Sequence, residues 1–167
     1  MKLKILFSVL FILILSQKIV SQKTIYRRIS YISGTIYEVS DNVIKLLDGS
    51  IWVTEYSSSS LPLTDIIIIY DGKNIFGTAF IDGDEISIKH LSGNVVLSSG
   101  YYTYVTKKYG EGAILVTEDG SYWEIPEYDR YYSGYWLPPY KVLITSNELY
   151  MYNLKENKKI WISRVEK

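Results

Sequence analysis

The sequence contains one five-residue motif twice, and this repeat constrains the fold more than any other feature. Residues 48–52 read Asp-Gly-Ser-Ile-Trp, and residues 119–123 read Asp-Gly-Ser-Tyr-Trp, 71 positions later. Each copy lies between two apolar runs rich in isoleucine, valine, threonine and tyrosine. An Asp-Gly pair between such runs predicts a β-hairpin with a two-residue type I′ turn, because both central residues of that turn have positive φ. The sequence therefore predicts two hairpins in equivalent places.

The similarity between the two halves extends beyond the hairpins. The matching segments are Leu61-Pro62 with Leu137-Pro138, residues 66–68 with 142–144, and Ile86 and Ile88 with Ile160 and Ile162. The offset changes from 71 to 76 and then to 74, which requires insertions and deletions in turns only, where they are tolerated best. We therefore expect an internal duplication with one unit at residues 29–97 and another at 100–165.

Turn signals recur along the whole chain, and the segments between them read as short strands. The 17 tyrosines and many β-branched residues favour strands. The run of isoleucines at 66–69 predicts a strand that is buried on both faces. The expected fold is all-β, with two tandem small barrels of SH3-like or OB-like type. A single larger sandwich built from both halves is the alternative.

The first residues have the pattern of a secretory signal peptide. Lys2 and Lys4 precede an apolar run from Ile5 to Leu15, which is too short to span a bilayer as a helix. We expect a signal peptide at residues 1–21, with cleavage after Ser21 or after Ser16, and an exported protein, periplasmic or extracellular. The alternative is an uncleaved anchor. No transmembrane segment is expected in the mature chain, and the absence of cysteine excludes disulfides and a lipid-modified cysteine.

A two-residue turn in each hairpin also fixes which side chains share a face, because alternate residues of a strand point the same way. In the second hairpin the Trp123 face would then include Ile114 and Val116. In the first hairpin the Trp52 face would include Val43 and Lys45. The opposite face would carry four aliphatic side chains, Ile44, Leu46, Ile51 and Val53. We expect this apolar face to be an interface, either with the second unit or with another chain in a homo-oligomer. A different core register, with Trp52 outside, is the alternative.

The most unusual surface stretch is an aromatic segment in the region where the second unit has gained residues. Its candidate ligand-binding residues are Tyr128, Asp129, Arg130, Tyr131, Tyr132, Tyr135 and Trp136. Aromatic rings offer a large contact area to sugar rings or partner side chains, and the two charged residues could orient a polar ligand. The alternative is a loop that folds back over an open end of the barrel. A second tyrosine cluster at 101–109 is expected to pack across strands.

No group of residues predicts catalysis, a metal or a cofactor. Asp82, Asp84 and Glu85 surround a glycine but lack the spacing of a calcium loop, and tight turns use these residue types for their geometry. His90 is the only histidine, and the serines at 57–60 have no nucleophile-elbow context. Lysine plus arginine and aspartate plus glutamate are 18 each, so no net field favours nucleic acid.

The second unit resembles uncharacterised exported bacterial small β-barrel proteins. Residues 114–125 read Ile-Leu-Val-Thr-Glu-Asp-Gly-Ser-Tyr-Trp-Glu-Ile, followed by the tyrosine-rich loop, Trp136-Leu137-Pro138 and an apolar strand at 142–144. The first unit departs from this pattern, since no tryptophan precedes Leu61-Pro62. The resemblance implies the fold and export only, because that family brings no established activity.

These observations predict an exported, non-enzymatic binding or assembly module whose ligand is a protein or a glycan. The alternative is a carbohydrate or cell-wall glycan binder in which the aromatic loop stacks on sugars. A more distant alternative is a hydrolase with two carboxylates assembled across the two units.

Overall fold

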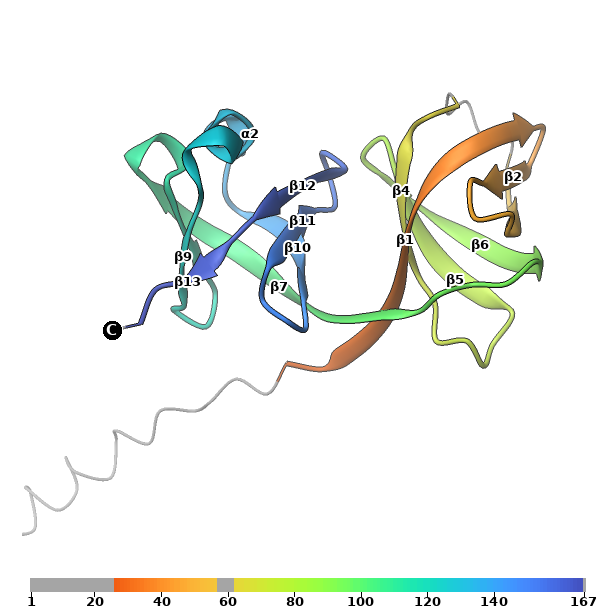
Figure 1. Cartoon of the computed structure of the whole chain (residues 1–167), viewed down its shortest axis with the longest axis horizontal. Coiled ribbons are helices and arrows are strands. Elements are labelled where there is room, and N and C mark those ends of the chain that lie inside the picture. The colour runs from red at the N-terminus through yellow and green to blue at the C-terminus, as the bar shows by residue number, and fades with distance from the viewer. Residues whose placement is uncertain (1–25, 57–61, 167) are drawn as a thin grey trace, which may run out of the picture.

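The computed structural model describes residues 26–56 and 62–166, and in this part of the chain nearly every element is a strand (Figure 1). The strands of the first half are β1 (Arg28–Ser40), β2 (Val43–Leu46), β3 (Ile51–Thr54), β4 (Asp65–Ile69), β5 (Phe76–Ile81) and β6 (Asp84–Ser92). The all-β prediction is confirmed. The predicted signal peptide, residues 1–21, lies outside the described residues.

The first half is a closed barrel of six strands. The hydrogen-bonded order is β1-β2-β3-β6-β5-β4, and β4 pairs again with β1. The ring closes because β1 is long enough to serve two neighbours: residues 31–35 pair with β4 and residues 36–40 pair with β2. The register of the β1–β2 pair shifts between Ile36 and Glu38. Such a bulge bends the strand at the point where it changes neighbours.

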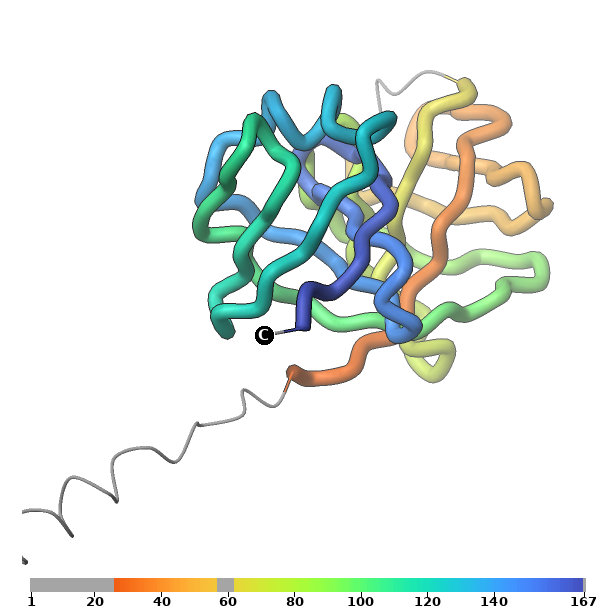
Figure 2. The backbone as a smooth tube through the Cα atoms, turned by 60° about the vertical axis from the view of Figure 1, so that its left-hand side comes forward, coloured from red at the N-terminus to blue at the C-terminus, as the bar shows by residue number. Residues whose placement is uncertain are grey.

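The second half follows with seven strands and three short helical segments. They are β7 (Ser98–Tyr109), η1 (Gly110–Gly112), β8 (Ile114–Thr117), β9 (Tyr122–Glu124), η2 (Glu127–Asp129), α2 (Arg130–Tyr135), β10 (Tyr140–Thr145), β11 (Tyr150–Asn153), β12 (Lys158–Trp161) and β13 (Ser163–Arg164). Figure 2 follows this chain as a tube, with β7 beginning where the first half ends.

The strands of the second half pair in the order of the first. β7 pairs with β10 and β8, β8 with β9, and β10 with β11. The last strand is divided, so that β12 pairs with β11 and β13 pairs with β9. A register shift in β7 between Val105 and Lys107 corresponds to the shift in β1 between Ile36 and Glu38.

Each half has its own core, built around one tryptophan of the repeated motif. The first core contains Trp52, Ile36, Ile66, Ile68 and Ile88 among others. The second contains Trp123, Trp136, Val142, Ile144 and Ile160 among others. The side chains of the two motif tryptophans are fully buried, which agrees with a structural role.

A third apolar cluster lies between the two halves. It joins Tyr31, Ile67 and Phe80 of the first half to Leu143, Tyr152 and Leu154 of the second. The four-isoleucine strand therefore has two buried faces, as predicted, because Ile66 and Ile68 point into the barrel and Ile67 points into this cluster. Residues 28–31 of β1 also pair with residues 98–101 of β7. One continuous sheet thus crosses the expected boundary between residues 97 and 100.

The turns of the two repeated hairpins differ from the prediction. Gly49 has φ 85° and Gly120 has φ 79°, but neither preceding aspartate has positive φ. Leu46 N–H donates to Ser50 O at 2.9 Å, and Gly49 N–H donates to Leu46 O at 3.0 Å. This is a three-residue loop, a type I turn followed by a left-handed glycine. Among the Asp-Gly pairs of the described residues, Asp82-Gly83 alone forms the two-residue turn with two positive φ values, 49° and 91°.

The aspartate side chain stabilises this three-residue loop. Asp48 Oδ1 accepts hydrogen bonds from Ser50 N at 2.8 Å and Ser50 Oγ at 2.6 Å. In the second hairpin Asp119 accepts from Ser121 N at 3.0 Å and from Ser121 Oγ at 2.5 Å. The motif therefore stabilises the turn, because the aspartate carboxylate accepts hydrogen bonds from the serine that follows the glycine.

The extra loop residue moves the strand register by one, and a slip of one residue exchanges the two faces of a strand. Ile44, not Lys45, pairs with Trp52, and the buried Ile44 and Leu46 lie in the barrel core. The predicted outer face of Ile44, Leu46, Ile51 and Val53 is therefore wrong: only Ile51 and Val53 face outward, and both are half-buried. In the second hairpin, likewise, Leu115 rather than Ile114 or Val116 shares the core with Trp123.

Candidate functional site

The aromatic segment forms two short helical elements, η2 and α2, at one end of the second half (Figure 1). The sequence alone predicts a loop here. Residues 128, 131, 132 and 135 are all tyrosine, and this spacing places them on one face of a helix. Residues 129, 133 and 136 project from a different side of the segment and are buried. The segment is therefore amphipathic, with its tyrosines turned away from the protein.

Three polar contacts anchor the inner side of the segment. The buried Asp129 carboxylate accepts a hydrogen bond from Trp161 N at 2.6 Å, through Oδ2. Arg130 Nε donates to Ile125 O at 3.0 Å, and the fully buried Ser133 donates through Oγ to Gly112 O at 2.8 Å. Each contact satisfies a backbone group of a neighbouring element, which would otherwise be costly to bury.

The helix approaches η1 so closely that two glycines are required. A Cβ on Gly112 would lie 2.5 Å from Gly134 N, and a Cβ on Gly134 would lie 2.9 Å from Glu111 O. Gly112 also has φ 94°, which side chains disfavour. Lys108 Nζ donates to Gly134 O at the same contact. Close backbone packing thus fixes the position of α2.

Trp136 completes the second core instead of lining a surface. Its side chain is buried, and its ring makes an edge contact with Tyr140 at 5.5 Å between centroids. The inward positions of Trp136 and Asp129 contradict the expectation that these side chains meet a ligand, and Arg130 is half-buried on the backbone of Ile125. Part of the segment therefore packs on the second core instead of facing solvent.

The outer side of the segment carries the four tyrosines, which we call the tyrosine platform. The exposed fractions are 66% for Tyr128, 69% for Tyr131, 40% for Tyr132 and 73% for Tyr135. The Tyr131 ring makes edge contacts with Tyr132 at 5.5 Å and with Tyr135 at 5.3 Å. The platform combines ring faces for stacking with phenol groups for hydrogen bonds. The platform therefore offers an exposed aromatic contact surface.

Trp161 is an exposed aromatic residue that the sequence analysis missed. Its backbone N–H binds Asp129, so it belongs to the strand on which the segment rests. Its side chain is 42% exposed and lies 4.3 Å from the Tyr150 ring. The strand alternation around Ile160 and Ile162, both buried, could have identified it, since the residue between two core positions of a strand points outward.

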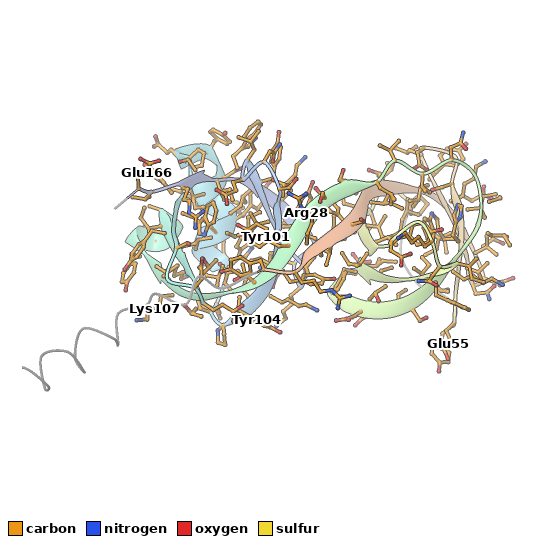
Figure 3. The ribbon with its side chains drawn as sticks, turned by 90° about the horizontal axis from the view of Figure 1, so that it is seen from below. Arg28, Glu55, Tyr101, Tyr104, Lys107 and Glu166 are labelled. Atoms are coloured by element: carbon orange, nitrogen blue, oxygen red, sulfur yellow. The ribbon has the colours of Figure 1, made fainter. Side chains whose placement is uncertain are left out.

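The tyrosines of β7 contribute mainly to packing. Tyr101 packs against the second core and stacks on Tyr26 at 4.5 Å, and Tyr102 packs against the cluster between the halves. Burial raises the pKa of both Tyr101 and Tyr102, and it raises that of Tyr26 to about 12. Tyr104 is exposed on the side of β7 seen in Figure 3.

The other residues weighed from the sequence do not form a site in the described part of the chain. No group of three or more metal-ligating side chains occurs there, and Glu85 forms an ion pair with Lys141 at 3.7 Å. His90 packs on Trp52 at 4.7 Å between ring centroids. The serines at 57–60 lie outside the described residues. No helix between residues 26 and 56 or 62 and 166 is long and apolar enough to cross a membrane.

Comparisons of the chain with models of protein families, with curated proteins and with solved structures find no match. The resemblance drawn from the hairpin motif therefore stays an expectation, and the candidate site is defined by its geometry alone.

Proposed function

We propose that this protein is an exported, non-enzymatic binding or assembly module and that the tyrosine platform is its contact surface. One observation carries this proposal. Four tyrosines project from a segment whose opposite side is held by Asp129, Ser133 and Trp136. Placing large aromatic side chains in water gains nothing for folding, whereas rings on a fixed support bind with a small loss of conformational entropy.

We also propose that the two halves arose by duplication of one small barrel. Three features support this: the strands pair in the same order, the bulges after Ile36 and Val105 occupy corresponding positions, and both Asp-Gly-Ser turns make the same hydrogen bonds. The helical segment occurs in the second half, where the chain has gained residues. An insertion of residues into a loop of a shared scaffold is a good candidate for a specific function.

Export is proposed from the sequence pattern of residues 1–21, with its positive start and short apolar run. It places the platform in an envelope or extracellular setting, where the partners are proteins or glycans. The proposal predicts that the mature protein begins near residue 17 or 22, which N-terminal sequencing of the secreted protein would determine.

Glycan binding is the second candidate, and the shape of the platform favours testing it directly. Tyr131 and Tyr135 each expose more than two thirds of their surface. Aromatic faces of this kind stack against the apolar faces of sugar rings. Trp136 cannot report such binding by fluorescence, because its ring is buried, so Trp161 is the better optical probe.

The test compares Tyr131→Ser/Tyr135→Ser with Tyr104→Ser, which removes an exposed tyrosine from β7. Isolated cell-wall glycan and an oligosaccharide of N-acetylglucosamine are the glycan probes. A photo-crosslinker placed at residue 128 is the protein probe. The proposal expects that the double variant folds as the parent does and loses either glycan binding or the crosslinked product, while the control keeps it. If the double variant binds glycan or crosslinks as well as the Tyr104→Ser control does, the tyrosine platform is not the contact surface.

A further inference from the structure

Another surface feature lies at the start of β1, where the two halves meet. A hollow of about 550 Å³ opens between the start of β1, the end of β4, the start of β5 and Tyr102 of β7. Its lining includes Arg27, Arg28, Ile69, Phe76, Thr78 and Tyr102. This volume falls within the range of pockets that hold small molecules.

The strand pairings explain why a hollow forms here. Arg28 pairs with Tyr101 across the β1–β7 junction, and Ile69 pairs with Thr78 across β4 and β5. Figure 3 shows Arg28 and Tyr101 where the two halves meet. Gly77 allows β5 to lie close to β4, because a Cβ on Gly77 would lie 2.6 Å from Ile69 O. The hollow therefore lies beside the β4–β5 pair of the first half, with Tyr102 of β7 at its edge.

The charges around the hollow favour an anion. Arg27 and Arg28 are exposed, and neither makes an ion pair with a residue that the structure describes. The nearby Asp71 carboxylate already accepts hydrogen bonds from Lys73 N and Asn74 N, both at 2.9 Å, and from Asn74 Nδ2 at 2.8 Å. The Asp71 carboxylate is therefore engaged in hydrogen bonds within its own turn. Within residues 26–56 and 62–166, the two guanidinium groups therefore have no ion-pair partner.

The rest of the lining favours a ligand with an apolar body. Phe76 is 61% exposed, and Ile69 and Tyr102 belong to the apolar cluster between the halves. Ser30 and Thr78 add hydroxyl groups. A guanidinium group binds a carboxylate through two parallel hydrogen bonds, and this geometry selects planar anions.

We propose that this hollow binds a small carboxylate ligand with an apolar or aromatic body, with Arg27 and Arg28 holding the carboxylate and Phe76 and Tyr102 contacting the body. This site is separate from the tyrosine platform, and neither proposal depends on the other. The same chemistry could come from a free organic acid or from the carboxyl end of a peptide.

The test is a calorimetric or NMR titration of the purified protein with N-acetyl-phenylalanine. Its matched control ligand is N-acetyl-phenylalanine amide, which has the same shape without the charge. The matched protein control for Arg27→Gln/Arg28→Gln is Lys107→Gln/Lys158→Gln, which removes two exposed positive charges elsewhere. All proteins are first compared by circular dichroism and thermal unfolding.

We expect the acid to bind with a dissociation constant in about the millimolar range and the amide to bind at least tenfold more weakly. The arginine variant should lose at least tenfold in affinity for the acid, whereas the lysine variant should not. Phe76→Ser should weaken binding of the acid as well. A short peptide ending in phenylalanine that binds more tightly than the acid would identify a peptide end, and weaker binding would identify a free acid. Equal binding of acid and amide, an arginine variant that behaves as the lysine control, or no binding below about 10 mM would overturn the proposal.

Discussion

The backbone N–H of Trp161 donates a hydrogen bond to the carboxylate of Asp129 at 2.6 Å. This contact joins β12 to the aromatic segment at the place where the last strand of the second half is divided. In the first half, β6 is continuous and pairs directly with β3. In the second half the Asp129 carboxylate instead binds the last residue of β12, and β13 makes the pairing with β9.

Removal of this carboxylate should therefore destabilise the second half. In Asp129→Ala the N–H of Trp161 loses its partner in a buried setting, which we expect to lower the free energy of unfolding by about 1–3 kcal/mol. Glu127→Ala, an exposed acidic residue of the same segment, is the control and should change stability little. Urea unfolding followed by tryptophan fluorescence measures both. Equal stability of the two variants would contradict the anchoring role.

The close contact between η1 and α2 predicts a large effect of one methyl group. Gly112→Ala places a Cβ 2.5 Å from Gly134 N at a residue with φ 94°, so both strain and a steric clash should destabilise the protein by about 3 kcal/mol or more. Gly120→Ala is the matched control, since φ is 79° there but nothing lies within 4 Å of the added Cβ. Gly120→Ala should lower the free energy of unfolding by about 1 kcal/mol. Thermal unfolding would rank the two, and a similar loss in both would mean that backbone strain alone matters.

The two motif tryptophans should respond differently to loss of the serine hydroxyl. Trp52 Nε1 donates to Ser50 Oγ at 2.9 Å, whereas Trp123 Nε1 donates to Thr117 Oγ1 at 3.1 Å. Ser50→Ala leaves a buried indole N–H without its partner and should cost about 1–3 kcal/mol. Ser121→Ala keeps the indole bond and should cost less, while Thr117→Val should resemble Ser50→Ala. Denaturant unfolding of the three variants tests this order.

Stability should fall at alkaline pH because of Tyr31. Burial between the halves, with Tyr152 beside it, raises the pKa of Tyr31 from 10.0 to about 12. The folded state holds this proton more tightly than the unfolded chain, so the stabilisation is complete below pH 10.0 and is lost as the pH rises to about 12. Over this interval Tyr31→Phe should lose less stability than the parent, by up to about 2 kcal/mol. Tyr104→Phe, which removes an exposed phenol, is the control, and parallel pH profiles for parent and Tyr31→Phe would contradict the assignment.

The parts of the fold that follow from local sequence were predictable. The Asp-Gly turns, the β-branched runs and the two-sided burial of Ile66, Ile67 and Ile68 depend on neighbours in sequence. The hairpin register could not be predicted from the local sequence. A two-residue and a three-residue loop both place glycine after aspartate, and the hydrogen bonds from Asp48 to Ser50 accompany the longer loop.

The candidate site was predicted as a stretch of sequence but not as a surface. The tyrosine spacing indicates a helix, yet α2 has only 6 residues, far fewer than an isolated helix needs for stability. Its conformation depends on contacts such as Gly112 with Gly134, which lie in different elements. The division into inward Asp129 and Trp136 and outward tyrosines follows from that tertiary contact. The hollow beside Arg28 likewise requires the arrangement of both halves.

The position of Tyr31 has a consequence for the order in which the chain can fold. Tyr31 pairs with Ile69 on one side and with Ser98 on the other, so it is shared between the first barrel and the junction. During synthesis the N-terminal end of the chain emerges first. The ring of β1 to β6 can therefore close before Ser98 is made, because the pairing of β1 with β4 requires only residues that precede Ser98. Until then the junction edge of β1, together with Ile67 and Phe80, remains uncovered. Arrival of β7 and β10 then covers this surface, so the second half protects the exposed strand edge and apolar side chains of the first.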